Sequence, residues 1–248
     1  MYISNKDIRA RARYLLDDNI FGKDWIKISV VAGVVLTSLT IIAMLLVTVS
    51  STIIGVLTSL LVLAGVQSFT FFVIAEIFAA VLSILASAIV MGPFLVGSSS
   101  AYLDLERGEG DAHIVRLFDG FKRFFENSLL SFMYMLQIFL WTLLGIIPGI
   151  YFAFSYAMVF YVKHDNPEFT WKQCFDESER LMAGNRWRYF KLQMSFYGWY
   201  LLGAIGFFGI GSFWAMSYAG VSTAVFYDLI KEEKDMEGKL TSCTVIIP

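Results

Sequence analysis

The chain has 248 residues, of which 57% are hydrophobic and only 16% are charged. Soluble domains carry about 25% charged residues, so this chain has too little polar surface to cover a soluble globule. Its net charge of −2 gives no electrostatic footprint for nucleic acid, which we therefore do not expect as a partner.

Charged residues are confined to four clusters, at 1–27, 104–126, 163–191 and 228–239, apart from a single Glu76. The stretches between the clusters are apolar, and a helix needs about 20 apolar residues to cross a bilayer. The first apolar run is too long for a cleavable signal peptide. The sequence therefore predicts an all-α, multi-pass membrane protein.

The orientation follows from the cations, because all 19 Lys and Arg residues lie in the four clusters. Cationic loops mark the cytoplasmic side, so an even number of spans should join successive clusters. We expect six transmembrane helices with both termini in the cytoplasm.

The first unit, residues 1–103, begins with an amphipathic surface helix in "IRARARYLLDDNIFGKDWIKI". Two spans should follow, near 26–49 and 74–102. The apolar segment 50–75, which leads from one to the other, should be helical as well, because backbone at membrane depth must satisfy its own hydrogen bonds.

The second unit, 104–166, and the third, 167–231, each contain one charge-free stretch that fits two spans and a tight turn. The turns should lie in "GIIPGI" (145–150) and "GFFGIGS" (206–212), where glycine permits the sharp reversal. A cytoplasmic tail, 232–248, would complete the chain.

These two units read as an internal repeat. "RLFDGFKRFFENSLLSF" (116–132) aligns with "RLMAGNRWRYFKLQMSF" (180–196) without a gap. The first unit fits the same plan loosely, so we expect about three helical-hairpin repeats, each preceded by a cytoplasmic amphipathic helix. In the third unit this helix should run from Pro167 to Gly184, since proline suits a helix start and glycine a helix end.

The cations of the repeat suggest a lipid contact. Their stems can lie along the interface while their heads reach anionic headgroups, and the neighbouring aromatic rings suit the same level. The candidate headgroup contacts are Lys122, Arg123, Arg186, Arg188 and Lys191. The alternative is that this collar only anchors and orients the hairpins.

Few other residues suggest chemistry. Glu76 is an intramembrane polar candidate, although a span that starts near residue 74 would place it at the outer interface. The acidic loop from Asp104 to His113 matches no established metal site, and Cys174 and Cys243 have no metal or redox spacing. We therefore predict no metal site, no catalytic residue and no cofactor.

Several segments together resemble a family of bacterial polytopic membrane proteins that is known only as a domain of unknown function. They are "RLFDGFKRF", "IIPGIYFAFSYAMVFYVKHDNPE", "SERLMAGNRWRYFKLQMSFYGW" and "GIGSFWAMSYAGVSTAVFYDL". The resemblance extends from Lys6 to Lys231 and implies a location in the bacterial plasma membrane. A fainter likeness is to the membrane portion of some glycerophosphodiester phosphodiesterases, whose catalytic barrel has no room in this chain.

Two functions fit these observations. The first is a non-enzymatic membrane protein that handles or senses a lipidic or amphipathic molecule, by transport or by binding, with membrane lipids as partners. The alternative is an accessory or immunity-type protein that binds another membrane protein. A large polar-lined cavity would favour the first, and an exposed face of small residues the second.

Overall fold

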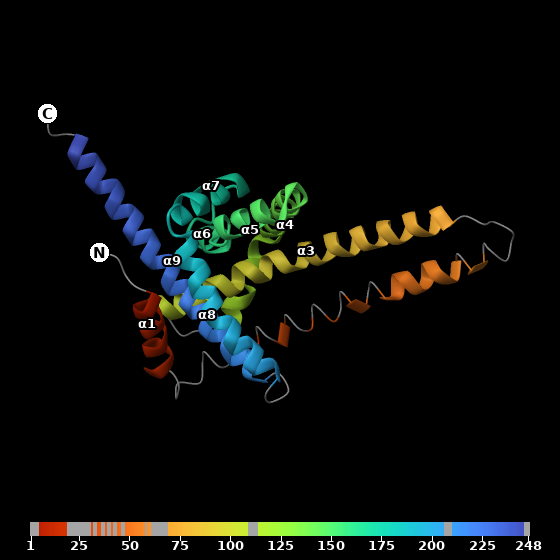
Figure 1. Cartoon of the computed structure of the whole chain (residues 1–248), viewed down its shortest axis with the longest axis horizontal. Coiled ribbons are helices and arrows are strands. Elements are labelled where there is room, and N and C mark those ends of the chain that lie inside the picture. Colours follow the sequence, from red (N-terminus) through yellow and green to blue (C-terminus); the bar gives the residue numbers. More distant parts are fainter. Residues whose placement is uncertain are drawn as a thin grey trace.

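The structure is a computed structural model of the whole chain (Figure 1). The residues that it describes are 5–18, 31, 34–35, 38, 41, 44–45, 48–57, 59–60, 69–108, 114–205 and 210–245. Within these residues all regular structure is helical and there is no strand, which confirms the predicted all-α class. Most of the predicted first span, the turn residues 206–209 and residues 109–113 of the acidic loop lie outside the described part.

A long arm projects from a body of shorter helices (Figure 1). The arm contains the first half of α3 (Phe69–Arg107), which exceeds the predicted span of 74–102 at both ends. Residues Thr48–Leu57 are helical, as expected for this apolar segment. They lie against α3, because Ser51 Oγ donates a hydrogen bond of 3.2 Å to Glu76 Oε2.

The second unit forms a helical hairpin. The 3-10 helix η1 (Ile114–Arg123) leads directly into α4 (Phe124–Leu144), and Gly145 alone separates α4 from α5 (Ile146–Ser155). The turn therefore lies at Gly145, the first residue of the predicted range 145–150. A short α6 (Val159–Asp165) continues beyond α5.

A break separates α5 from α6, and a serine of the next helix bridges it. Ser178 Oγ accepts a hydrogen bond from the Met158 amide at 3.2 Å and donates one to the Ser155 carbonyl at 2.9 Å. Both backbone groups would otherwise be unpaired, because the helical ladder is interrupted here. Ser178 is fully buried at this position.

The third unit begins with α7 (Trp171–Met182), followed by α8 (Arg186–Ile205) and α9 (Ile210–Val245). The prediction that Pro167 starts α7 is wrong, because a capping box of Thr170 and Gln173 starts the helix instead. The predicted end is confirmed, since Gly184 follows in the left-handed region with a φ of 85°.

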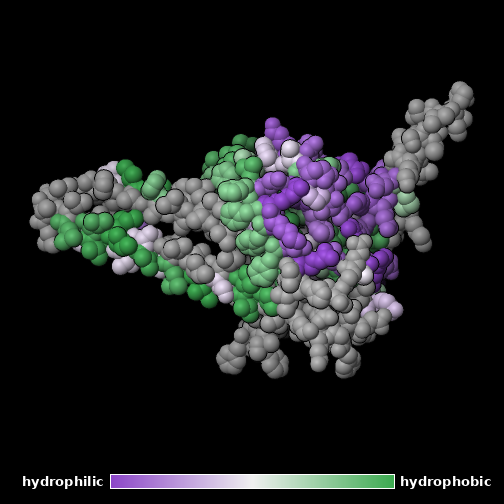
Figure 2. All heavy atoms as spheres, turned by 180° about the vertical axis from the view of Figure 1, so that it is seen from behind, coloured by the Kyte–Doolittle hydropathy of each residue, from purple (hydrophilic) through white to green (hydrophobic). Residues whose placement is uncertain are grey.

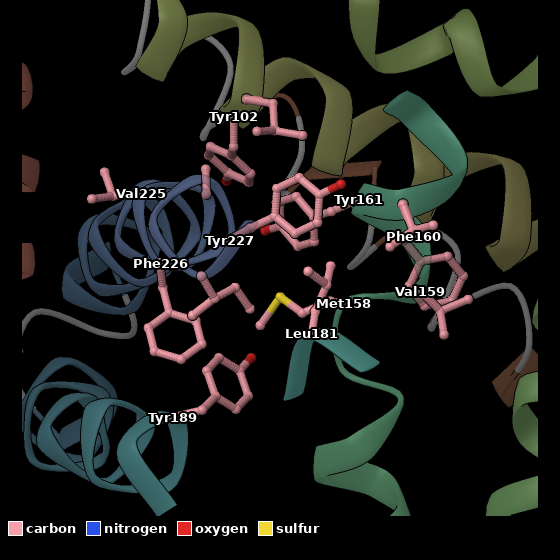
Figure 3. Packing of buried hydrophobic residues seen from close by; sticks show 14 of the residues in the cluster. Tyr102, Met158, Val159, Phe160, Tyr161, Leu181, Tyr189, Val225, Phe226 and Tyr227 are labelled. Carbon is pink, nitrogen blue, oxygen red and sulfur yellow. The ribbon is translucent and has the colours of Figure 1, made fainter. Parts of the chain in front are cut away.

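The core lies where α3, α6, α7, α8 and α9 meet (Figure 3). Tyr161 and Tyr227 stack there with ring centroids 5.5 Å apart, and Met158 and Leu181 are fully buried beside them. Helix α3 comes especially close to η1. A Cβ atom at Gly97 would overlap the Leu117 carbonyl oxygen, so the approach requires a residue without a side chain.

Two helical segments are long and apolar enough to cross a membrane, Arg116–Leu144 and Ile146–Asp165. Their shared turn exposes large apolar side chains, including Leu144 and Ile147. Most of the described residues on the arm and on the adjoining side of the body are hydrophobic, whereas hydrophilic residues gather on the opposite side of the body (Figure 2). Such a large exposed apolar surface is typical of a lipid or protein interface.

Candidate functional site

The first two predicted lipid-contact residues lie at the end of η1. Lys122 has an ion pair of 2.9 Å with Asp119, and 76% of its side chain is exposed. Arg123 donates through Nη1 to the carbonyl of Pro167 and to Glu126, at 2.5 and 3.4 Å. The Arg123 head therefore lies beside the loop that joins α6 to α7, and Lys122 lines a pocket together with Pro167 of that loop.

The other three candidates lie on the first turns of α8. Arg186 Nε donates to Ser155 Oγ at 2.7 Å, and its guanidinium lies 4.3 Å from the centre of the Tyr151 ring. Arg188 is buried and forms an ion pair of 3.0 Å with Glu233 of α9. Lys191 is exposed, with its ammonium 5.5 Å from the Trp187 ring. Arg186 and Arg188 thus hold neighbouring helices, whereas the head of Lys191 faces outward.

A charged cluster that the sequence analysis did not single out joins the C-terminal ends of α3 and α6 to the middle of α9. We call it the ionic cluster: Arg107 of α3, Asp165 of α6, and Asp228 and Lys231 of α9. Arg107 forms two hydrogen bonds to each carboxylate, at 2.8 and 3.0 Å to Asp165 and at 3.0 and 2.6 Å to Asp228. Lys231 pairs with the same Asp165 carboxylate, and Tyr227 donates to it at 3.1 Å.

The ionic cluster controls the protonation of Asp165. Burial alone would raise the pKa of this carboxyl, but hydrogen bonds from Arg107 and Lys231 outweigh it and lower the pKa to about 2. Only 7% of the Asp165 side chain is exposed. At neutral pH the Asp165 carboxylate ties α6 to α3 and α9, because without its two cations it would be left charged and buried.

Glu106 lies next to this cluster and behaves in the opposite way. Burial and a hydrogen bond with Asp228 raise its pKa to about 7, although Arg11 of α1 (Asn5–Asp18) lies 2.8 Å away and opposes the shift. Two neighbouring carboxyl groups in a dry site favour sharing a proton. Glu106 therefore titrates near neutrality.

The stretch predicted as an acidic loop is helical up to Arg107 of α3, and its Asp104 has partners in other helices. Asp104 forms an ion pair of 2.9 Å with Arg116, and His164 Nε2 lies 3.6 Å from its other oxygen. His164 thus faces Asp104 of another helix. Among the described residues, no group of three or more His, Cys, Asp or Glu side chains could hold a metal ion.

Glu76 and Cys174 complete the candidates from sequence. Glu76 lies in the second turn of α3, half-buried beside Ser51. The Cys174 thiol is fully buried in the core, and burial raises its pKa to about 11. A buried thiol of high pKa is a poor nucleophile, so its role is packing.

Two small pockets adjoin one another at the α6–α7 loop. The basic pocket has a volume of about 190 Å³, and its walls include Lys122, Arg123, Lys163 and His164. The apolar pocket has a volume of about 250 Å³ and shares Arg123 and Lys163 with it. Its other walls are Glu126, Leu129, Leu130, Glu168, Phe169, Thr170 and Trp171.

Residues 143–234 match a family described as "Protein of unknown function (DUF975)". The match covers less than half of the chain, and it contains Asp165, Asp228 and Lys231 of the ionic cluster but not Arg107. It agrees with the resemblance to an uncharacterised family. No curated protein and no solved structure matches the chain, and nothing in the comparisons bears on the phosphodiesterase likeness.

The ionic cluster left a signal in the sequence. Asp228 directly follows an apolar stretch, and Asp165 stands three residues beyond another. Charges of both signs at equivalent ends of apolar helices favour an interhelical ion pair, because the ends of neighbouring spans lie at one level.

Proposed function

We propose that this chain is a multi-pass protein of the bacterial plasma membrane that binds a lipidic or amphipathic molecule at its cytoplasmic surface. The observation that carries the proposal is the helical segment Arg116–Leu144. It is long enough to span a bilayer, and only 22% of its apolar 18-residue stretch is buried inside the protein. Lys122 and Arg123 lie near its start. A segment of this kind has lipid tails along its length and anionic headgroups at its end.

The proposed topology has six spans, three hairpin units and both termini in the cytoplasm. The order of the helices supports the two C-terminal units, because a short helix followed by two helical segments occurs twice along the chain. The first set is η1, α4 and the α5–α6 pair, and the second is α7, α8 and α9. The test is labelling of single cysteines with an impermeant maleimide. Cysteine at Ile147, in the exposed turn, should react in intact cells, and cysteine at Glu179 of α7 only after permeabilisation. Labelling of Glu179→Cys from outside would refute the topology.

The test of lipid binding is the composition of the lipid that copurifies with the protein. We expect anionic lipid to be enriched over its share of the membrane. Replacing the exposed cations in Lys122→Gln/Lys191→Gln should reduce that enrichment, because each surface cation contributes about 1 kcal/mol. Lys234→Gln, on the C-terminal part of α9, is the matched control and should retain it. Copurified lipid with the same composition as the whole membrane would refute the proposal.

The alternative, an accessory protein that binds another membrane protein, has one observation in its favour. Thr48, Thr52, Gly55 and Ser59 recur on one face of the arm, and a Cβ atom at Gly55 would meet nothing within 4 Å. Small residues let membrane helices approach closely. Native mass spectrometry of the gently extracted protein distinguishes the two functions, since a second polypeptide of fixed stoichiometry would favour the alternative.

A further inference from the structure

The two adjoining pockets at the α6–α7 loop differ in net charge. The basic pocket is positive, whereas the charges of the apolar pocket balance, with Arg123 and Lys163 against Glu126 and Glu168, and its other walls are mainly apolar side chains. Arg123 and Lys163 form the wall between the basic pocket and the apolar pocket. One molecule that occupied both would need a polar, anionic part next to an apolar part. A phospholipid has this structure, with a phosphate beside its acyl chains.

The basic pocket has donors available for a phosphate. Arg123 uses only Nη1 in the hydrogen bonds described, which leaves its Nε and Nη2 groups for a ligand. Lys122 has a single ion-pair partner, Asp119. Arginine suits phosphate because its planar fork can donate two parallel hydrogen bonds.

Lys163 contributes charge rather than a donor. Its side chain is buried, and its ammonium already donates to Glu126, to the Pro167 carbonyl and to the Phe169 carbonyl at 2.7–2.9 Å. The walls of the basic pocket therefore hold three cations (Lys122, Arg123, Lys163) and one carboxylate (Asp119), apart from His164. Glu126 and Glu168 line only the second pocket, so the positive charge is concentrated where a phosphodiester would bind.

The apolar pocket opens toward the exposed face of α4. Leu129 forms part of its wall and is itself 43% exposed. Leu136, Leu140 and Leu143 follow at helical spacing, and all are exposed. An acyl chain that left the pocket beside Leu129 would have a continuous apolar track along about 21 Å of helix.

We propose that these two pockets form a single phospholipid site, with the phosphodiester held by Arg123 and Lys122 and the glycerol and first acyl carbons seated between Leu129 and Trp171. The site rests on the proposed function, in which the start of α4 lies at the cytoplasmic interface. It adds a defined stoichiometry of one seated phospholipid per chain to the general attraction of a basic surface.

The experiment is a native mass spectrometry titration of the delipidated protein with phosphatidylglycerol, and separately with phosphatidylethanolamine. Arg123→Gln should weaken the first phosphatidylglycerol about tenfold, because charge-assisted hydrogen bonds to its phosphate are lost. Lys234→Gln, which changes a cation outside both pockets that pairs with Glu237, is the control and should change it less than about twofold.

Leu129→Trp is the decisive variant, because it fills the apolar pocket without changing any charge or hydrogen bond. A seated phospholipid should be weakened by it, whereas a diffuse electrostatic layer should not. Lys122→Gln serves as a second polar variant if Arg123→Gln proves unstable, since its only described partner is on the surface.

The outcomes separate the two proposals. If Arg123→Gln, Lys122→Gln and Leu129→Trp all bind like Lys234→Gln, the seated site is refuted while anionic lipid binding stands. If the wild-type protein does not distinguish phosphatidylglycerol from phosphatidylethanolamine, the proposed binding of anionic lipid fails as well. If soluble glycerol phosphate or inorganic phosphate displaces the lipid at equal concentration, the ligand is a free phosphate ester and the phospholipid assignment is overturned.

Discussion

Replacing Arg107 by methionine tests whether the ionic cluster holds α3, α6 and α9 together. The change keeps much of the side-chain volume but leaves Asp165 with one cation and Asp228 beside Glu106. Removing one partner of a buried ion pair costs about 3–5 kcal/mol. Arg107 is 25% exposed and Lys231 still faces Asp165, so we expect the lower end of this range, about 3 kcal/mol.

The assay is thermal unfolding in detergent, followed by a thiol-reactive dye in a Cys243→Ser background. Cys174 is fully buried and becomes accessible only when the core opens. For a chain of this size, 3 kcal/mol corresponds to a fall in Tm of about 6–12 °C.

Arg180→Met is the matched control, because Arg180 forms an exposed pair with Glu177 that should contribute less than about 1 kcal/mol. If the two variants lower Tm by the same amount, the ionic cluster does not join the helices and the reasoning is refuted.

Three further predictions use the same assay. Gly97→Ala should destabilise the protein by about 1–3 kcal/mol, because the added Cβ atom overlaps η1. Gly198→Ala is the control and should not destabilise the protein, since a Cβ atom there meets nothing within 4 Å. Equal effects of the two variants on Tm would argue against the close approach of α3 and η1. Ser178→Ala should cost about 1–3 kcal/mol, because the buried Met158 amide loses its acceptor, and an unchanged Tm would contradict this. The pKa of Glu106 is raised to about 7 from an ordinary 4.5. The free energy of unfolding should therefore fall by about 3 kcal/mol as the pH rises from 4.5 to 7, and Glu106 should cause no further fall above pH 7. Glu106→Gln should remove that loss, so a Tm that still falls between pH 5 and pH 7 would show that another group titrates.

The sequence predicted the helical class and the turn at Gly145 because both depend on local signals. Segregated charge marks long apolar helices, and Gly145 stands within a stretch too long for one span. The start of α7 was predicted at Pro167 and lies at Trp171 instead. Two start signals competed in this segment. The amide and the hydroxyl of Thr170 both donate to Gln173 Oε1, and this capping interaction outweighed the preference of proline for a first turn.

The pairing of charges could not be predicted in the same way, because it depends on how helices pack. Arg107 is 58 residues from Asp165 and 121 residues from Asp228. For the same reason, position along α8 did not reveal that Arg188 has Glu233 as a partner while Lys191 faces outward. Lipid contact by the five cations stays a prediction, and the exposed heads of Lys122 and Lys191 are those best placed for it.

The hydroxyl that bridges the α5–α6 break has a consequence for biogenesis. Ser178 is synthesised 20 residues after Met158, whose amide donates a hydrogen bond to the Ser178 hydroxyl. While the hairpin forms, the Met158 amide and the Ser155 carbonyl therefore have no partner from their own segment. The hydroxyl that pairs with both arrives only when α7 has left the ribosome and docked. Formation of the α4–α6 hairpin and docking of α7 are thus completed together, and a chain stalled before Ser178 would hold an unfinished hairpin.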